Sequence, residues 1–213
     1  MSELEIRDLN NYVVVSGVVK SKPQYDYQMY GERFYTATIE AMRQSGTIDE
    51  LQMSVSERLL PKPLEVLEGM KVCAEGEVRS YEKSWSDGKP RHLVVVFPRY
   101  LYENDDNQNF VSLEGTICKE VEYRVTTFGR EIADICLAVN RAYGKASYIP
   151  CIAWGRTARW ASQLDVGEKV RIEGRFQSRI YAKWLKTTPE CNGKWVERTA
   201  YEVSIRCMTK VDT

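Results

Sequence analysis

Apolar residues alternate with polar ones over three stretches in the second half of the chain, namely residues 109–118, 132–139 and 148–154. Alternation with a period of two is typical of strands that bury one face. In the third stretch the residues on one face are small and apolar, which suits a barrel interior. The pattern therefore predicts three strands, each with one face in a protein core.

A longer alternating stretch, residues 170–181, predicts a fourth strand, and residues 195–207 predict a fifth. Between the third and fourth strands, residues 156–164 place Ala and Leu at helical spacing and contain neither Pro nor Gly, which predicts a short helix. Five strands with one helix between the third and the fourth form the layout of the OB-fold, a small Greek-key barrel.

The whole pattern occurs twice. Residues 11–80 align with residues 109–178 at a fixed offset of 98 positions without a gap, and fourteen positions are identical. Five of the fourteen are Gly, which indicates a shared backbone need, such as a positive φ or a sharp bend, rather than a shared ligand. Only at the helix is the first copy unclear, because Pro61 and Pro63 interrupt it. The predicted fold class is all-β with short helices, as tandem OB-fold five-stranded Greek-key barrels.

The repeat also divides the chain into predicted domains. A length of 213 residues fits two domains of typical size. Residues 101–108 are polar and lie just before the repeat restarts, as an exposed linker would. We expect an N-terminal diverged OB-fold over residues 1–100, a linker over 101–108 and a C-terminal OB-fold over 109–213.

Composition excludes several classes of protein. The longest apolar runs are far too short to span a bilayer, and the first residues lack a basic flank and an apolar stretch, so we expect a cytoplasmic protein without a membrane partner. The six cysteines show no Cys-x-x-Cys spacing, and His92 is the single histidine. We therefore expect no metal and no other cofactor, with most cysteines serving as small core residues.

A catalytic function finds little support. The sequence has no Gly-rich phosphate loop and no metal-spaced cluster of His, Cys and Asp. The adjacent carboxylates Asp49 and Glu50 fall in a predicted loop or at a strand end, where solvated surface charge is the expected explanation. We predict that the chain is not an enzyme.

Aromatic residues mark the outer face of the third predicted strand of the second copy. Strand side chains alternate between faces, so Tyr148 and Trp154 share one face, and Ile149, Cys151 and Ala153 share the other. The small apolar set suits the interior and leaves the rings outside. Bases stack on such rings for roughly 1–3 kcal/mol each. The alternative is that the rings cap the barrel or pack at a dimer interface.

Basic residues extend this surface along the fourth predicted strand. Its outward face carries Arg171, Arg175, Arg179 and Tyr181. Its inward face carries Val170, Ile172, Phe176 and Ile180. Residues 105–213 hold 17 Lys and Arg against 14 Asp and Glu, whereas residues 1–104 hold 13 against 16. A polyanion would therefore prefer the second copy.

The first copy is an internal control for this surface. At offset 98, the positions of Tyr143, Tyr148, Trp154 and Arg175 hold Ser45, Glu50, Ser56 and Glu77. The apolar interior positions are kept while the aromatic face is lost. The tyrosines of the first copy crowd instead into a predicted loop after its first strand, at residues 25–30. The two copies should therefore do different jobs.

Three stretches of the second copy, residues 137–141, 148–158 and 167–179, resemble the bacterial single-stranded DNA-binding protein family. The resemblance covers nearly all of residues 109–207, and residues 11–97 look like a diverged copy. It implies a bacterial protein of the cytoplasm or nucleoid. It further implies base stacking by the aromatics at the matching positions, which are Tyr143, Tyr148, Trp154 and Tyr181.

The resemblance also implies an assembly of four OB-folds. Asn11–Lys20 and Asn109–Lys119 would pair as first strands within one chain, and two chains would form a homodimer. The chain ends at Thr213 without the acidic tail that is usual in the family, so we expect no recruitment of replication or repair proteins through such a tail. The connection at residues 142–146 is short for the family, so the occluded length of DNA should be small.

The predicted function is sequence-independent binding and protection of single-stranded DNA in replication, recombination or repair. Two alternatives remain open, an OB-fold adaptor that binds a replication or conjugation protein, and an RNA binder. The predicted nucleic-acid-binding residues are Arg141, Tyr143, Tyr148, Trp154, Arg156, Arg171, Arg175, Arg179, Tyr181 and Lys183.

Overall fold

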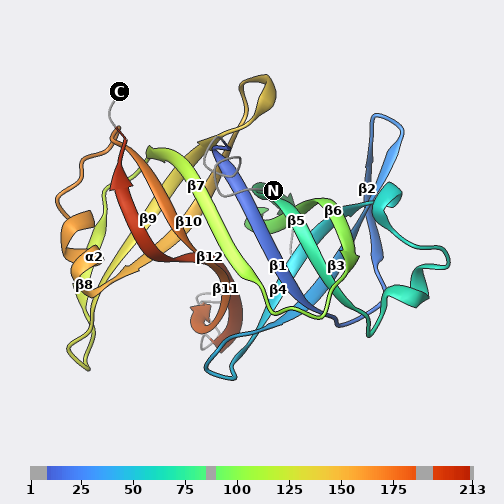
Figure 1. Cartoon of the computed structure of the whole chain (residues 1–213). Helices are drawn as coiled ribbons and strands as arrows, with labels where there is room; N and C mark the ends of the chain where they lie inside the picture. Colours follow the sequence, from blue (N-terminus) through green and yellow to red (C-terminus); the bar gives the residue numbers. More distant parts are fainter. Residues whose placement is uncertain (1–8, 85–89, 186–193, 212–213) are drawn as a thin grey trace, which may run out of the picture.

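The computed structural model describes residues 9–84, 90–185 and 194–211 (Figure 1). The first half contains β1 (Asn11–Val19), β2 (Gln24–Met29), β3 (Glu32–Met42), β4 (Ile48–Ser56), the 3-10 turns η1 (Glu57–Leu59) and η2 (Leu64–Leu67), β5 (Lys71–Ser84) and β6 (Pro90–Glu103). The second half contains β7 (Asn109–Ile117), β8 (Glu122–Val125), β9 (Glu131–Asn140), η3 (Ala142–Gly144), β10 (Ala146–Trp154), α2 (Gly155–Ala161), β11 (Lys169–Leu185) and β12 (Lys194–Lys210).

Each half closes into a barrel of five strands. In the first half the hydrogen-bonded order is β1, β5, β6, β4 and β3, and β3 pairs back onto β1. The second half repeats this order with β7, β11, β12, β10 and β9, and the pairing of β9 with β7 closes it. The predicted all-β OB-fold class is confirmed.

Glycine allows each barrel to close. A Cβ on Gly17 would lie 2.3 Å from the backbone oxygen of Glu40, and a Cβ on Gly115 would lie 2.8 Å from that of Ala138. Gly17 lies where β1 crosses onto β3, and Gly115 lies where β7 crosses onto β9. The shared glycines of the repeat therefore do meet a backbone requirement, as the sequence indicates.

Each half also contains a sixth strand that the alternation pattern does not reveal. Strands β2 and β8 are short, lie outside the closed barrels and pair only with β3 and β9. The tyrosine-rich segment at residues 25–30 was expected to be a loop, and this expectation is wrong for residues 25–29, which form part of β2. Strand β2 is exposed or half-buried along its length, so it lacks the periodic burial that pattern reading needs.

The two barrels share one continuous sheet. Strands β1 and β7 pair antiparallel, with Val13 opposite Val111, and join all twelve strands. The first strands of the two copies therefore pair within the chain, as the resemblance implies. Strand β6 continues to Glu103, and Leu101 packs against the core, so the connection between the barrels is shorter than the predicted linker.

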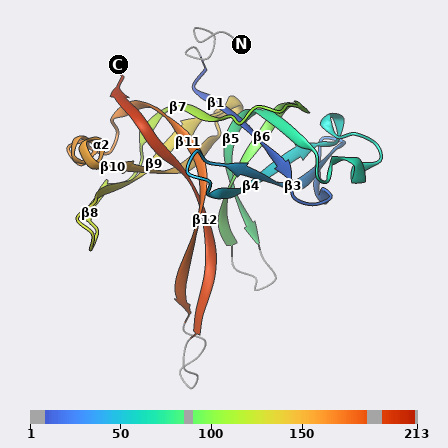
Figure 2. The same cartoon turned by 60° about the horizontal axis from the view of Figure 1, so that its bottom comes forward.

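Two arms leave the barrels on the same side of the molecule. The pairing of β11 with β12 continues to Leu185, and β5 and β6 form a shorter arm beside it (Figure 2). Inside the barrel, Phe176 is fully buried. Ile180 was expected on the inward face, but it lies on the arm with 70% of its surface exposed, because an arm of two strands has no interior.

The helices of the described residues include none with the length and apolar content needed to span a bilayer. Of the cysteines, Cys73 and Cys151 are buried, Cys118 and Cys136 are half-buried and Cys207 is exposed. Cys191 lies outside the described residues.

Candidate nucleic-acid interface

Strand β10 places aromatic rings on its outer face. Tyr148 is 49% exposed and Trp154 is 41% exposed, whereas Ile149, Cys151 and Ala153 are buried in the barrel. The faces assigned from strand parity are therefore the observed ones. No ring-to-ring contact of Tyr148 or Trp154 occurs within residues 9–84, 90–185 and 194–211. Both rings are open to a ligand.

Trp154 occupies a position that a polar residue would serve better for stability alone. It lies at the N-cap of α2 and makes no side-chain cap hydrogen bond. The equivalent Ser56 in the first barrel accepts a hydrogen bond from the backbone N–H of Arg58 and so caps η1. A missing N-cap costs about 1 kcal/mol. The second barrel therefore carries an exposed ring where the first carries a structural cap.

Tyr143 is presented by the turn between β9 and β10. Its backbone adopts φ 62°, in the left-handed region, and its side chain is 99% exposed. Non-glycine residues with positive φ are uncommon and cost free energy, so a fully exposed ring held there is a candidate for ligand contact. Arg141 immediately precedes this turn.

The basic residues of β11 are engaged in ion pairs or hydrogen bonds. Arg171 donates to Glu114 on β7 at 2.6 Å, and Arg175 donates to the side-chain oxygen of Gln177 at 3.2 Å. Arg179 donates to Glu202 on β12 at 3.2 Å, and its guanidinium lies 5.8 Å from the ring centre of Tyr181. These contacts orient the side chains, and the two ion pairs offset the charges of Arg171 and Arg179.

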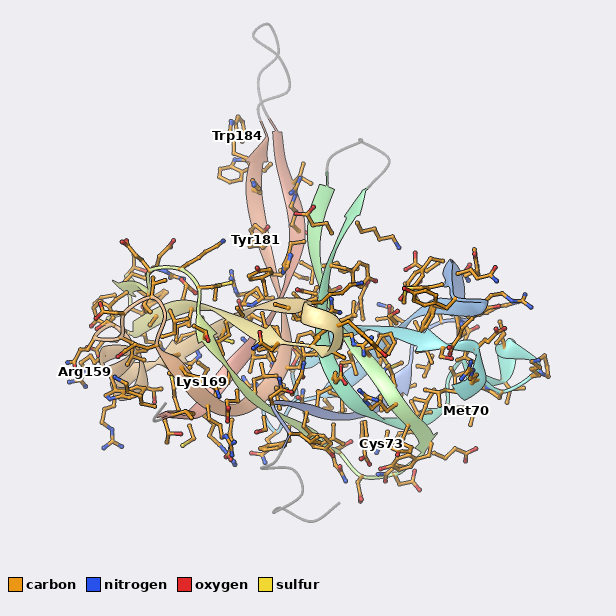
Figure 3. The ribbon with its side chains drawn as sticks, turned by 90° about the horizontal axis from the view of Figure 1, so that it is seen from above. Met70, Cys73, Arg159, Lys169, Tyr181 and Trp184 are labelled. Atoms are coloured by element: carbon orange, nitrogen blue, oxygen red, sulfur yellow. The ribbon has the colours of Figure 1, made fainter. Side chains whose placement is uncertain are left out.

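Tyr181 lies on the β11–β12 arm together with Trp184, far along the strand from Lys169 (Figure 3). Lys183 is exposed on the same arm, and Arg156 is exposed on α2. The predicted residues are therefore distributed over β10, the turn before it, α2 and the arm. Strand β12 separates β10 from β11 in the sheet, so the aromatic face of β10 and the basic face of β11 do not adjoin directly.

The first barrel supports β10 across a contact that we call the Ser147 seam, formed by Ser80, His92, Ser147 and Tyr148. The backbone N–H of Tyr148 donates to Ser80 Oγ at 2.7 Å, and the backbone N–H of Ser80 donates to Ser147 Oγ at 3.2 Å. His92 Nε2 hydrogen-bonds to the backbone oxygen of Tyr148 at 2.7 Å. Sequence reasoning predicted Tyr148 but missed Ser80, His92 and Ser147, although Ser80 is one of the identities of the repeat.

A second contact, the Asp49 seam, is the counterpart at offset 98 and is formed by Arg43, Asp49 and Ser178. Arg43 donates to both carboxylate oxygens of Asp49 at 2.6 Å, and the backbone N–H of Ser178 donates to Asp49 at 2.9 Å. Asp49 has no exposed surface. The expectation of a solvated charge is wrong for Asp49, because β4 turns its side chain into the contact between the barrels.

A groove of about 1240 Å³ runs between the barrels next to the Ser147 seam. The second barrel contributes Arg141, Tyr143 and Lys145 to its walls, and the first contributes, among others, Arg79 and Arg99. Within the described ranges, no group of three or more metal-ligating side chains occurs. Exposed rings on a β-barrel beside a groove with a cationic wall form a surface for stacking and phosphate contacts. The fold and this surface define a tandem OB-fold protein of the nucleic-acid-binding type.

Comparisons with known proteins agree with this class. The sequence pattern of the Single-strand binding protein family matches residues 108–209. Single-stranded DNA-binding protein B of Bacillus subtilis is 36% identical over 80 residues, which are 34% of this chain and 71% of that protein. Single-stranded DNA-binding protein A of the same organism is also 36% identical over 80 residues, but these make up only 46% of its length.

The solved structure of the wild-type single-stranded DNA binding protein from Thermus aquaticus superimposes with a TM-score of 0.69 at 19% identity. The match covers 95% of this chain and 93% of that one, and the likeness is one of fold. Because it is 36% identical to Single-stranded DNA-binding protein B over 71% of that protein, the chain belongs to the single-strand binding protein family.

Proposed function

We propose that the chain binds single-stranded DNA without sequence preference, in replication, recombination or repair, and that the strand is held mainly on the second barrel. The single observation that carries the location is the aromatic face of Tyr143, Tyr148 and Trp154, which is exposed and free of ring contacts within the described residues. Every base has a π-face, so stacking on such rings tolerates any sequence.

Basic side chains near these rings provide for the phosphates. Arg141 and Lys145 flank Tyr143, and Arg156 follows Trp154 at the start of α2. Arg175, Arg179 and Lys183 extend the basic surface along β11, and Tyr181 adds a further ring there. Phosphate contacts of this kind make affinity depend strongly on salt, because each neutralised phosphate releases counterions.

The assembly and the setting are part of the proposal. Two chains would bring four OB-folds together as a homodimer, with residues 1–100 and 109–213 as the two OB-fold domains of each chain. The protein would act in the bacterial cytoplasm or nucleoid. Replication or repair proteins are the expected partners besides DNA.

The test is a titration with oligo-dT followed by tryptophan fluorescence over a salt series. Binding should quench Trp154 and weaken as salt rises. The double variant Tyr148→Ala, Trp154→Ala should lose roughly 2–6 kcal/mol of binding free energy, since each stacked base contributes about 1–3 kcal/mol. The matched control is Glu50→Ala with Ser56→Ala at the equivalent positions of the first barrel, which should bind as the wild type does.

A mobility-shift assay at low salt decides the case independently of fluorescence. Absence of binding in both assays would refute the proposed function. Equal losses in the double variant and its control would place the strand on both barrels alike and refute the assigned location. Capture of a protein partner that survives Trp154→Ala, in a chain without DNA affinity, would favour the adaptor function instead.

A further inference from the structure

Within the described residues, Arg141 differs from the other two arginines of the groove, Arg79 and Arg99, which both form ion pairs with Glu77. The Nε of Arg141 is buried and makes no hydrogen bond with any described residue. Burial, followed by the nearby charge of Arg79, lowers the pKa of Arg141. Arg43, its repeat equivalent, shows the opposite behaviour, because hydrogen bonds to Asp49 raise the pKa of Arg43. The attraction of Glu77 opposes the lowering at Arg141 only in part, and a buried guanidinium N–H without an acceptor is costly in a folded protein.

One substitution between the copies explains this difference. Offset 98 takes Arg43 to Arg141 but takes Asp49 to Ser147, so the carboxylate that neutralises the first arginine is replaced by a hydroxyl. Asp49 and Ser147 have no exposed surface. Asp49 accepts a hydrogen bond from the backbone N–H of Ser178, and Ser147 accepts one from the backbone N–H of the equivalent Ser80. The backbone arrangement is kept, and the negative charge is absent.

The carboxylates of the groove are already taken. Glu77 pairs with Arg79 at 2.9 Å and also with Arg99. Glu75 accepts from the hydroxyls of Tyr12 and Tyr102. The charged residues that line the groove are Arg79, Arg99, Arg141, Lys145, Glu75 and Glu77, so the walls retain an excess of positive charge.

Tyrosines stand at both walls of the groove. Tyr143 of the second barrel and Tyr30 of the first both have positive φ, and both side chains are almost fully exposed. Tyr100 on β6 adds a third exposed ring. Exposed rings beside basic walls form a surface suited to single strands, and this surface includes residues of both barrels.

We propose that the groove binds a backbone phosphate of single-stranded DNA between Arg141 and Arg79, so that the strand leaves Tyr148 and Tyr143 and continues onto the first barrel. This inference rests on the proposed function and extends the binding site beyond the second copy. Ser147 acts as a specificity position, because its lack of charge leaves Arg141 to the ligand.

The decisive variant is Ser147→Asp, with Ser147→Asn as its matched neutral control. Asp49 shows that this position accommodates a carboxylate hydrogen-bonded to the serine N–H and to the arginine. In Ser147→Asp, Arg141 should pair with the new carboxylate, oligo-dT affinity at low salt should fall on the order of tenfold, and the salt slope should shrink by about 0.7. Ser147→Asn adds no charge, so it should reduce affinity less than Ser147→Asp does and should keep the wild-type salt slope.

Arg79→Gln tests the contribution of the first barrel and, like Ser147→Asp, should reduce both the affinity for oligo-dT and the salt slope. Thermal unfolding with inorganic phosphate, against chloride at equal ionic strength, identifies free phosphate as the alternative ligand. If phosphate stabilises the wild type while Ser147→Asp binds oligo-dT normally, the groove holds free anions and the strand path is refuted. If Ser147→Asp binds oligo-dT with the affinity and salt slope of the wild type, this inference is overturned and the proposed function stands. If the wild-type protein does not bind oligo-dT at all, the proposed function is overturned.

Discussion

The two seams between the barrels have the same pattern of backbone hydrogen bonds but differ in the charges they contain. In the Asp49 seam, a buried carboxylate accepts from Arg43 and from the backbone N–H of Ser178. In the Ser147 seam, the serine accepts the matching bond from Ser80, and beside the seam the buried Nε of Arg141 has no hydrogen-bond acceptor among the described residues. One seam is therefore neutralised internally, and the other is left in a state that an anion can complete. The difference indicates that the first seam serves stability and the second serves binding.

The same division continues on the outer face of each barrel. In the first barrel Glu50 pairs with Lys20, which also lies 3.6 Å from Glu40. At offset 98 these three positions hold Tyr148, Cys118 and Ala138. The first barrel therefore has an ion-pair cluster on this face, whereas the second has an exposed aromatic ring beside small side chains. Changes at a few positions thus convert a self-satisfied surface into a ligand-binding one without altering the barrel.

The largest expected effect comes from removing the charge partner at the Asp49 seam. Asp49→Ala leaves Arg43 at the seam without its carboxylate and should lower the free energy of unfolding by about 3–5 kcal/mol. Ser147→Ala, the matched change at the other seam, removes one neutral acceptor and should cost about 1 kcal/mol. Urea unfolding of both variants measures the difference. Equal losses would contradict the division of roles between the seams.

A smaller and symmetric effect is expected where the copies agree. The side chain of Asn11 makes two hydrogen bonds to the backbone of Val78, and that of Asn109 makes the same two to Phe176. Asn11→Ala and Asn109→Ala should each lower the free energy of unfolding by about 2 kcal/mol, since two backbone groups lose their partner. Oligo-dT affinity in low denaturant should not change in either. A loss of affinity in only one variant would show that the shared asparagines are not purely structural.

Local patterns predict the barrels well, and contacts between distant segments explain what they miss. Alternation located β7, β9, β10, β11 and β12 because each has a buried face, and parity placed Tyr148 and Trp154 outside correctly. Parity failed at Ile180, because the strand continues past the barrel into an arm where both faces meet solvent. It also gave no sign that Asp49 is buried, because the residues that bury it come from the other barrel.

The candidate site was predictable in its aromatic part and at Arg141. Tyr143, Tyr148 and Trp154 can be identified from the sequence because the equivalent positions of the first copy are not aromatic. The groove depends on Arg79 and Arg99 of the first copy, in which acidic residues outnumber basic ones. Their proximity to Arg141 follows from the pairing of β1 with β7. The shared identities Arg43/Arg141 and Ser80/Ser178 were visible in the sequence. The replacement of Asp49 by Ser147 at the equivalent position was also visible, and it indicates that Arg141 lacks the carboxylate that pairs with Arg43.

The smallest expected effect concerns acid stability and again separates the copies. Burial alone would raise the pKa of Glu77, but the Arg99 and Arg79 guanidiniums overcome it and hold the pKa below its ordinary value of 4.5. A carboxyl with a lowered pKa stabilises the folded state above its unfolded pKa, and this contribution disappears as pH falls through the folded pKa. Glu77→Gln should therefore flatten the loss of unfolding free energy between about pH 6 and about pH 3. The second copy has Arg175 at this position, so Arg175→Gln should leave the acid limb of the stability curve unchanged, and urea unfolding across this range compares the two. A wild-type acid limb in Glu77→Gln would mean that its ion pairs contribute nothing to folding and serve only to occupy the carboxylate beside the groove.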